Sequence, residues 1–264
     1  MKAKLAKRLV ITALVISIIF LSGCTEAPSI DEDIDAEGII DDVSEEIMGD
    51  SEEDDESEPL IDPEDFVGVI DNPYFPLAVG TTFIYEGVSD GEDVRVELYV
   101  TDQTKEIMGV TTTVIREREW EDGELVEDTF DWYAQDEDGN VWYFGEDTKE
   151  YEDGEVVSTA GSWEGGVDGA EPGILVKGDP QVGDIYQQEY YEGEAEDMAE
   201  VLSLTESVTV GYGSFDNCLQ TREWTPLEPA AEENKYYAMD VGLLLEVATK
   251  GGESRVELID ITTE

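Results

Sequence analysis

The chain contains no histidine, only two cysteines, and only 14 lysine and arginine residues against 68 aspartate and glutamate residues. Without histidine, neither a histidine-based catalytic triad nor a histidine-ligated metal site can form. The sequence also lacks a Gly-x-Ser-x-Gly motif, a phosphate-binding loop and a Cys-x-x-Cys pair, which are typical of hydrolases, nucleotide-binding proteins and thiol redox proteins. We therefore expect a protein that is not an enzyme and that carries no cofactor and no metal.

The scarcity of basic residues gives the chain a formal net charge of −54 and an isoelectric point near 4.1. Nucleic acids and anionic lipid headgroups would be repelled by such a surface, so we expect neither to bind directly. Cations are expected to associate loosely with the carboxylates. A salt-rich habitat would explain this charge, and so would an ordinary exported protein with an acidic surface.

The N-terminal stretch has the parts of a secretory signal. Residues 1–8 carry four basic side chains, and residues 9–21 form an uncharged apolar run that is shorter than the roughly 20 residues of a membrane-spanning helix. Leu21-Ser22-Gly23-Cys24 resembles the lipobox of prokaryotic lipoproteins, which implies cleavage before Cys24 and attachment of a diacylglyceryl group to its thiol. We predict a signal peptide at 1–23 and a lipid anchor at Cys24 on the extracytoplasmic face of the cell membrane.

Lipidation of Cys24 would leave Cys218 without a disulfide partner. We expect Cys218 to be a buried, small apolar side chain rather than a nucleophile, because no histidine is present to activate its thiol. Residues 24–65 contain many acids and no basic residue. Charge repulsion within this segment predicts a disordered tether that holds the rest of the protein away from the membrane.

Residues 66–264 are predicted to form one all-β, antiparallel domain. Apolar and polar side chains alternate with a period of two, for example over 94–100 and 129–134, as expected for half-buried strands. Asp-Gly pairs, and the Gly-Gly pair at residues 251–252, lie between such stretches and supply the positive φ angles of tight hairpin turns. The pattern predicts a meander of roughly ten to twelve strands.

An internal repeat suggests that this domain has two related halves. Arg118-Glu119-Trp120 recurs as Arg222-Glu223-Trp224, 104 residues later, and Tyr133-Ala134 recurs as Tyr237-Ala238 at the same shift. Coincidence between two hairpins of similar composition is the alternative.

The repeat predicts a duplicated meander, with halves at about 74–160 and 178–264 joined by a glycine-rich bridge. Neither half could bury both faces of its sheet alone. The halves are therefore expected to share one strongly curved sheet, as a half-barrel, a barrel or a sandwich.

Arginines next to aromatic residues are the candidates for ligand binding. Arg118 and Arg222 each stand two residues from a tryptophan, so on a strand both side chains share its face. Each arginine is expected either to stack on that ring and pair with a cross-strand acid, or to hold an anionic group between aromatic walls. The candidate set is Arg118, Trp120, Trp132, Tyr133, Arg222, Trp224, Tyr236 and Tyr237.

The segment Asp136-Glu137-Asp138-Gly139-Asn140 resembles the opening of a calcium-binding loop. It lacks the glycine expected at the next position, where Val141 stands, and the loop would end on Asp147 instead of a glutamate. A hairpin turn explains the segment better.

Several motifs resemble an uncharacterised family of exported prokaryotic β-rich lipoproteins, archaeal or bacterial. They are Ile70-Asp71-Asn72-Pro73-Tyr74-Phe75-Pro76-Leu77, Trp132-Tyr133-Ala134-Gln135-Asp136, Gly161-Ser162-Trp163-Glu164, and Tyr236-Tyr237-Ala238 with Val241-Gly242-Leu243. The resemblance covers most of residues 70–264 and implies no functional residues.

Three functions remain open from the sequence. The first is a membrane-anchored cell-surface lipoprotein whose β-rich domain binds a small ligand or an envelope component. The second is a structural or interaction module of the surface without a small-molecule site. The third is a half-barrel carrier of a hydrophobic molecule.

Overall fold

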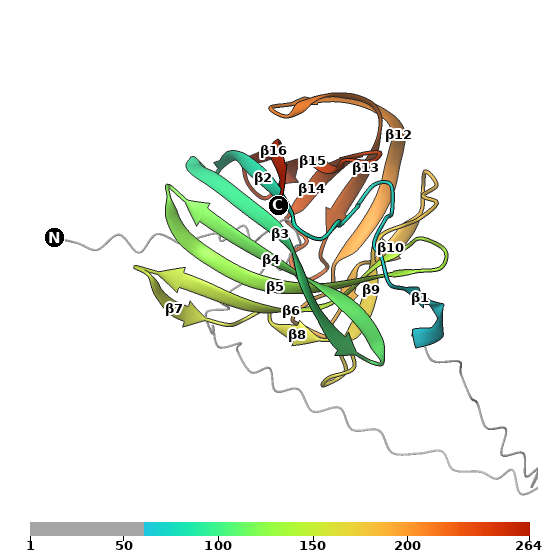
Figure 1. Ribbon diagram of the computed structural model, residues 1–264. Helices are drawn as coiled ribbons and strands as arrows, with labels where there is room; N and C mark the ends of the chain where they lie inside the picture. The colour runs from blue at the N-terminus through green and yellow to red at the C-terminus, as the bar shows by residue number, and fades with distance from the viewer. Residues whose placement is uncertain (1–60) are drawn as a thin grey trace, which may run out of the picture. The chain divides into compact units, whose positions relative to one another are not determined.

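The computed structural model describes residues 61–264 (Figure 1). The predicted signal peptide, the lipidation site Cys24 and residues 24–60 of the predicted tether lie outside the described residues. The last residues of the predicted tether, 61–65, are described: Ile61 is buried and Pro63–Asp65 form a 3₁₀ turn. Within residues 61–264, no helix is long and apolar enough to cross a membrane.

Strands dominate the described chain, and every strand pair is antiparallel. In order, the elements are the 3₁₀ turn η1 (Pro63–Asp65), β1 (Phe66–Val67), β2 (Thr81–Ser89), β3 (Glu92–Ile107), β4 (Val110–Glu121), β5 (Glu124–Asp136), β6 (Val141–Glu152), β7 (Glu155–Ser158), β8 (Trp163–Glu164), β9 (Glu171–Val176), β10 (Ile185–Gln187), β11 (Glu189–Tyr190), β12 (Met198–Val210), β13 (Gly213–Trp224), β14 (Glu232–Ala238), β15 (Gly242–Lys250) and β16 (Ser254–Thr263). The predicted all-β, antiparallel class is confirmed. The strands number sixteen rather than the expected ten to twelve, because several are only two to four residues long.

Thirteen of the strands form one continuous path, β10-β12-β13-β14-β15-β16-β2-β3-β4-β5-β6-β9-β11. Most neighbours on this path are also consecutive in the sequence, which is the predicted meander. The last strand, β16, pairs with β2, so that Leu258 lies opposite Tyr85. The two ends of the meander are thereby joined within the sheet (Figure 1).

Residues 185–190, which we call the closing segment, bring the two edges of this path together. Its first part, β10, pairs with β12, and its second part, β11, pairs with β9. One short stretch therefore changes partner at Gln188 and nearly closes the curved sheet into a barrel. The predicted strongly curved sheet is confirmed.

The Asp-Gly turns have the predicted backbone. Asp90 and Gly91 have φ angles of 49° and 94°, and Asp122 and Gly123 have φ angles of 49° and 84°. Two successive positive φ angles match the right-handed twist of the flanking strands, and aspartate and glycine tolerate them best. The hairpins β2–β3 and β4–β5 are therefore fixed by local sequence.

The segment before β2 packs against the sheet instead of merely leading into it. Ile70, Tyr74, Phe75 and Leu77 are buried, and the Phe75 ring meets the Tyr133 ring edge-on at 5.8 Å. Asn72, which is 1 % exposed, donates from its side chain to the Gly139 carbonyl at 2.8 Å. Residues 70–77 therefore cover one apolar end of the core.

The predicted glycine-rich bridge is part of the sheet. It contributes β8 and β9, and both pair with β6. Gly145 makes this possible, because its φ is +121° and a Cβ there would lie 2.2 Å from the Trp163 carbonyl oxygen. The bridge thus joins the two halves by hydrogen bonds as well as by the chain.

Residues matched by the repeat have the same burial in some strands and different burial in others. Glu119 and Glu223 are both buried, and Arg118 and Arg222 are both partly exposed, as a shift of 104 requires. Leu98 and Leu202 are also matched by that shift, yet Leu98 is buried whereas Leu202 is partly exposed. The duplication therefore stays a prediction.

Candidate functional site

Buried carboxylates line the inward face of the sheet, which is the main polar feature of the described chain. Glu117 lies opposite the buried Leu98, and Glu119 lies opposite the buried Val96, so these acids share a face with the apolar core. We call the set the interior acid cluster. Its buried members are Glu117, Glu119, Glu127, Asp131, Glu146, Glu189, Asp197, Glu223 and Glu246.

Lys235 on β14 is the basic residue of this interior and is 1 % exposed. Its Nζ lies 3.2 Å from Glu223 Oε2, 3.3 Å from Glu233 Oε1 and 3.7 Å from Glu246 Oε2. Burial lowers the pKa of Lys235, but the three carboxylates outweigh it and hold the pKa well above its ordinary value. Lys235 is therefore a charged ammonium group shared by three acids.

The carboxylates around Lys235 are held in turn by hydroxyl groups and by one another. Glu223 Oε1 accepts hydrogen bonds from the Thr221 hydroxyl at 2.7 Å and from the Tyr237 hydroxyl at 3.3 Å. Burial, and then the charge of Glu246, raise the pKa of Glu233 well above its ordinary value. Glu233 therefore holds a proton more readily than an ordinary glutamate does.

A second group of acids, which includes Asp131 and Glu146, lies beside two stacked tyrosines on β5 and β6. The rings of Tyr133 and Tyr143 are 5.0 Å apart, and the Tyr143 hydroxyl donates to Asp131 Oδ1 at 3.0 Å. Asp131 lies opposite Glu146 across the β5–β6 pair. Burial, and then the charge of Glu146, raise the pKa of Asp131 well above its ordinary value.

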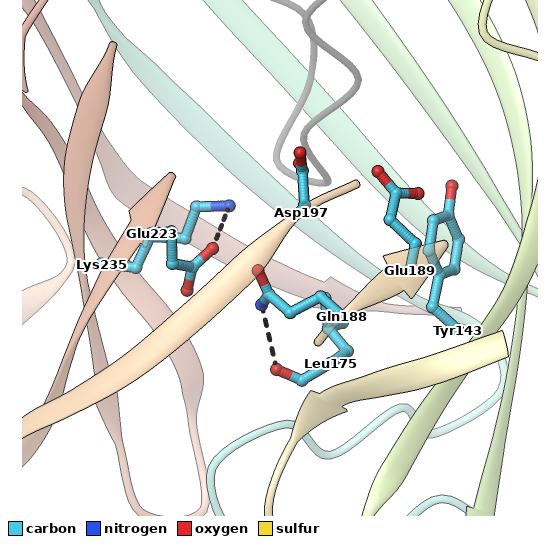
Figure 2. A pocket seen from close by; sticks show the side chains of 7 residues that line it. All are labelled: Tyr143, Leu175, Gln188, Glu189, Asp197, Glu223 and Lys235. Atoms are coloured by element: carbon cyan, nitrogen blue, oxygen red, sulfur yellow. Dashed lines mark hydrogen bonds and ion pairs between the residues drawn. The ribbon is translucent and has the colours of Figure 1, made fainter. Parts of the chain in front are cut away.

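A small cavity lies beneath the closing segment, between these two groups (Figure 2). Its volume is about 10 Å³, which leaves room for about one water molecule. The lining residues are Tyr143, Leu175, Gln188, Glu189, Asp197, Glu223 and Lys235. In Figure 2, Asp197 lies between the Lys235–Glu223 ion pair and Glu189, whose carboxylate is near the Tyr143 hydroxyl.

Arg118 and Arg222 make the contacts expected of stacked, ion-paired arginines. Arg118 Nη2 lies 2.9 Å from Glu97 Oε2, and its guanidinium lies 5.1 Å from the centre of the Trp120 ring. Arg222 pairs with Glu200 and lies 4.8 Å from the centre of the Trp224 ring. Both arginines lie on the face opposite the interior acid cluster, because they alternate with buried glutamates along their strands.

The four other candidate residues do not join the arginines at one place. Tyr133 and Tyr237 are buried in the core. Trp132 is also buried, and the Lys105 ammonium lies 3.2 Å from its ring centre. Tyr236 is partly exposed and accepts a hydrogen bond from Gln220 at 3.0 Å. The eight candidates thus divide between two faces of the sheet, and ligand binding by them stays a prediction.

The interior acid cluster was missed from the sequence, although a signal for it exists. In Ile115-Arg116-Glu117-Arg118-Glu119, basic and acidic residues alternate. If the arginines share a face with Trp120, the glutamates share the opposite face with Ile115. Period-two alternation therefore places Glu117 and Glu119 beside an apolar residue.

Two smaller predictions concern single residues. Asp136 closes the hairpin between β5 and β6, where its Oδ1 accepts from the Asn140 backbone N–H and its Oδ2 from the Trp142 indole, both at 2.8 Å; the hairpin interpretation is confirmed. Cys218 is a buried free thiol in the core, as predicted. Within residues 61–264, no three His, Cys, Asp or Glu side chains are arranged to hold a metal ion.

Comparison with known proteins gives two similar solved structures. No family model and no curated protein matches the chain. One similar structure is a protein from Bacteroides fragilis NCTC 9343 named as exported, with a YmcC-like fold; it is 16% identical, has a TM-score of 0.45, and the match covers 72% of this chain and 99% of that one. The other is a protein from Parabacteroides distasonis ATCC 8503 named as a lipoprotein, which is 12% identical with a TM-score of 0.40 over the same shares of the two chains.

Proposed function

We propose that this protein is a lipid-anchored protein of the extracytoplasmic face of the cell membrane, and that its β domain is a non-catalytic binding module for a cationic component of the cell envelope. The anchor rests on the sequence, in which a basic stub and an apolar run lead to Leu21-Ser22-Gly23-Cys24. The acidic segment that follows would keep the domain off an anionic membrane.

The choice of a cationic partner rests on the ion pairs that the basic residues form. Residues 61–264 contain ten lysines and arginines, and each lies 3.2 Å or less from a carboxylate oxygen. An anionic ligand would have to displace one of these acids, whereas the excess of carboxylates attracts a cationic surface. Electrostatic complementarity therefore favours a cationic partner.

The carrier alternative has less support. A site for a hydrophobic molecule is usually a cavity of roughly 300–1,000 Å³ with mostly apolar walls. The cavity beneath the closing segment is far smaller and is lined largely by polar and charged side chains. This cavity is therefore too small and too polar to hold a hydrophobic molecule.

The anchor is tested by Cys24→Ser in the native host, followed by fractionation into membrane and soluble material. We expect Cys24→Ser protein to leave the membrane or to remain unprocessed, and Cys218→Ala protein to stay in the membrane as the matched cysteine control. Normal processing and full membrane retention of Cys24→Ser would contradict the anchor.

The partner is tested by treating intact cells with a carbodiimide, which joins carboxylates directly to amines. We expect mass spectrometry to find cross-links between exposed acids of residues 61–264 and lysines of one envelope component. The proposal of a cationic partner fails if the protein is labelled at the surface and yet forms no cross-link to an amine of another molecule.

A further inference from the structure

Two buried glutamates on β5 and β6 are joined through two threonine hydroxyls. Glu127 and Glu146 are each 2 % exposed, Thr129 is 1 % exposed and Thr148 is 0 % exposed. Thr129 lies directly opposite Thr148 across the β5–β6 pair, and these two strands run side by side in Figure 1. We call Glu127, Thr129, Thr148 and Glu146 the carboxyl–hydroxyl chain, in the order in which their oxygens meet.

Three hydrogen bonds hold the carboxyl–hydroxyl chain together. Thr129 Oγ1 lies 3.0 Å from Glu127 Oε1 and 3.1 Å from Thr148 Oγ1. Thr148 Oγ1 lies 2.8 Å from Glu146 Oε2. Each of these contacts needs one hydrogen atom between its two oxygens.

The two hydroxyl groups cannot supply all of these hydrogens. A threonine hydroxyl carries one hydrogen, and an ionised carboxylate carries none. If both glutamates were ionised, each threonine would donate to its own glutamate, and the two hydroxyl oxygens would lie 3.1 Å apart with no hydrogen between them. A proton on one of the two carboxyl groups supplies the missing hydrogen.

The free oxygen of Glu127 also favours a proton in this place. Within residues 61–264, Glu127 Oε2 is a buried atom without a hydrogen-bond partner. A buried polar atom without a partner costs free energy, and the cost is greater when the group is charged. A neutral carboxyl group on Glu127 is therefore easier to accommodate than a carboxylate.

The neighbouring strands add negative charge to this part of the core. The titratable side chains that face the carboxyl–hydroxyl chain are Glu119 on β4, Asp131 on β5, Tyr143 and the partly exposed Glu150 on β6, and Glu189 on β11. Burial, and then the charges of Glu146 and Glu119, raise the pKa of Glu127 well above its ordinary value. The buried Lys235 pairs with three other glutamates.

We propose that the carboxyl–hydroxyl chain binds one proton, which is carried by either Glu127 or Glu146 and is linked to the other carboxylate through Thr129 and Thr148. When Glu127 carries it, Glu127 donates to Thr129, Thr129 donates to Thr148, and Thr148 donates to Glu146. A shift of each hydrogen along its own hydrogen bond moves the proton to Glu146, because each hydroxyl gives up one hydrogen and receives one. The site then holds one negative charge instead of two, and it is independent of the lipid anchor and of any partner outside the barrel.

Infrared difference spectroscopy at neutral pH tests this proposal, because protonated carboxyl groups and carboxylates absorb at different frequencies. The full-length chain, purified from membranes in a non-ionic detergent, is compared with Glu127→Gln, Glu146→Gln and the double variant. Glutamine has nearly the shape of glutamate, and its amide can donate the missing hydrogen, so we expect these variants to fold.

At least one single variant should lose the absorption of one protonated carboxyl group. The double variant should lose the absorption of one carboxyl group and one carboxylate. Glu124→Gln, at an exposed position of β5, is the matched control and should lose carboxylate absorption alone.

The proposal is overturned if both single variants lose only carboxylate absorption, because both glutamates would then be ionised. It is also overturned if the double variant loses the absorption of two protonated carboxyl groups, because each glutamate would then hold its own proton. If the double variant does not fold, the single variants still decide between a bound proton and none.

Discussion

Replacing Lys235 by methionine tests whether the interior acid cluster depends on its central ammonium group. Lys235 is 1 % exposed, and three carboxylates lie 3.2–3.7 Å from its Nζ. Methionine keeps most of the side-chain volume, so the change removes the charge and leaves the packing nearly intact. The carboxylates would then be buried without a counter-charge.

The expected loss is large. Removing one partner of a buried ion pair costs about 3–5 kcal/mol, and a domain of this size loses about 2–4 °C per kcal/mol. The thermal midpoint of Lys235→Met should therefore fall by roughly 6–20 °C. Lys250→Met is the matched control, because Lys250 is 58% exposed and pairs with Glu232 at the surface; its loss should stay below about 1 kcal/mol.

Thermal unfolding followed by circular dichroism at neutral pH measures both variants. Lys235→Met combined with Glu223→Gln should regain part of the stability, because one uncompensated charge is then gone. Equal midpoints for Lys235→Met and the unmodified protein would refute the reasoning that the ammonium group holds these acids. So would a combined variant no more stable than Lys235→Met, because the loss would then come from packing.

Three further predictions concern other parts of the barrel. Phe75→Ala should cost about 3–5 kcal/mol in urea unfolding, because the ring packs on the buried core, whereas Val69→Ala, at a side chain that is 64% exposed, should change little. Gly173→Ala should destabilise the protein, because the new Cβ would lie 2.5 Å from the backbone of the closing segment. Gly68→Ala should not, because a Cβ there meets nothing within 4 Å. Equal urea midpoints for the two variants would contradict the close approach at Gly173. The raised pKa of Asp131 means that the folded state binds its proton more tightly than the unfolded state, so the stabilisation is present below the ordinary pKa of 3.8 and is lost as the pH rises through the folded value. The urea midpoint should therefore fall as the pH rises above 3.8, and Asp131→Asn should make this fall less steep; an unchanged dependence of the midpoint on pH would contradict the role of Asp131.

The class of fold could be predicted because its signals are local. Alternation with a period of two marks β3 and β5, and Asp-Gly pairs at residues 90–91 and 122–123 set the hairpins between consecutive strands. In a meander these local signals also give most of the pairing, because neighbours in the sequence are neighbours in the sheet.

The closure of the sheet could not be predicted in the same way. Glu189 pairs with Pro172, and Ile185 pairs with Glu200, in strands of two or three residues that carry no recognisable pattern. The choice of these partners depends on how the long strands curve, and that follows from the packing of the whole barrel rather than from any segment.

The candidate site was only partly predicted for a related reason. The stacking of Arg118 on Trp120 and of Arg222 on Trp224 follows from spacing along one strand. The gathering of Glu189 and Asp197 in one cavity does not, because it depends on which strands meet inside the barrel. In so acidic a chain, the acids that point inward are distinguished only by register.

The proposed lipid anchor is tested most directly by mass spectrometry of the N-terminal peptide of the native protein. Trypsin is unsuitable, because no lysine or arginine occurs between Arg8 and Arg95. Cleavage after glutamate should release the short peptide Cys24-Thr25-Glu26. We predict that this peptide begins at Cys24 and carries a diacylglyceryl group on the thiol; an unmodified Cys24, or a peptide that continues into the apolar run before it, would contradict the account.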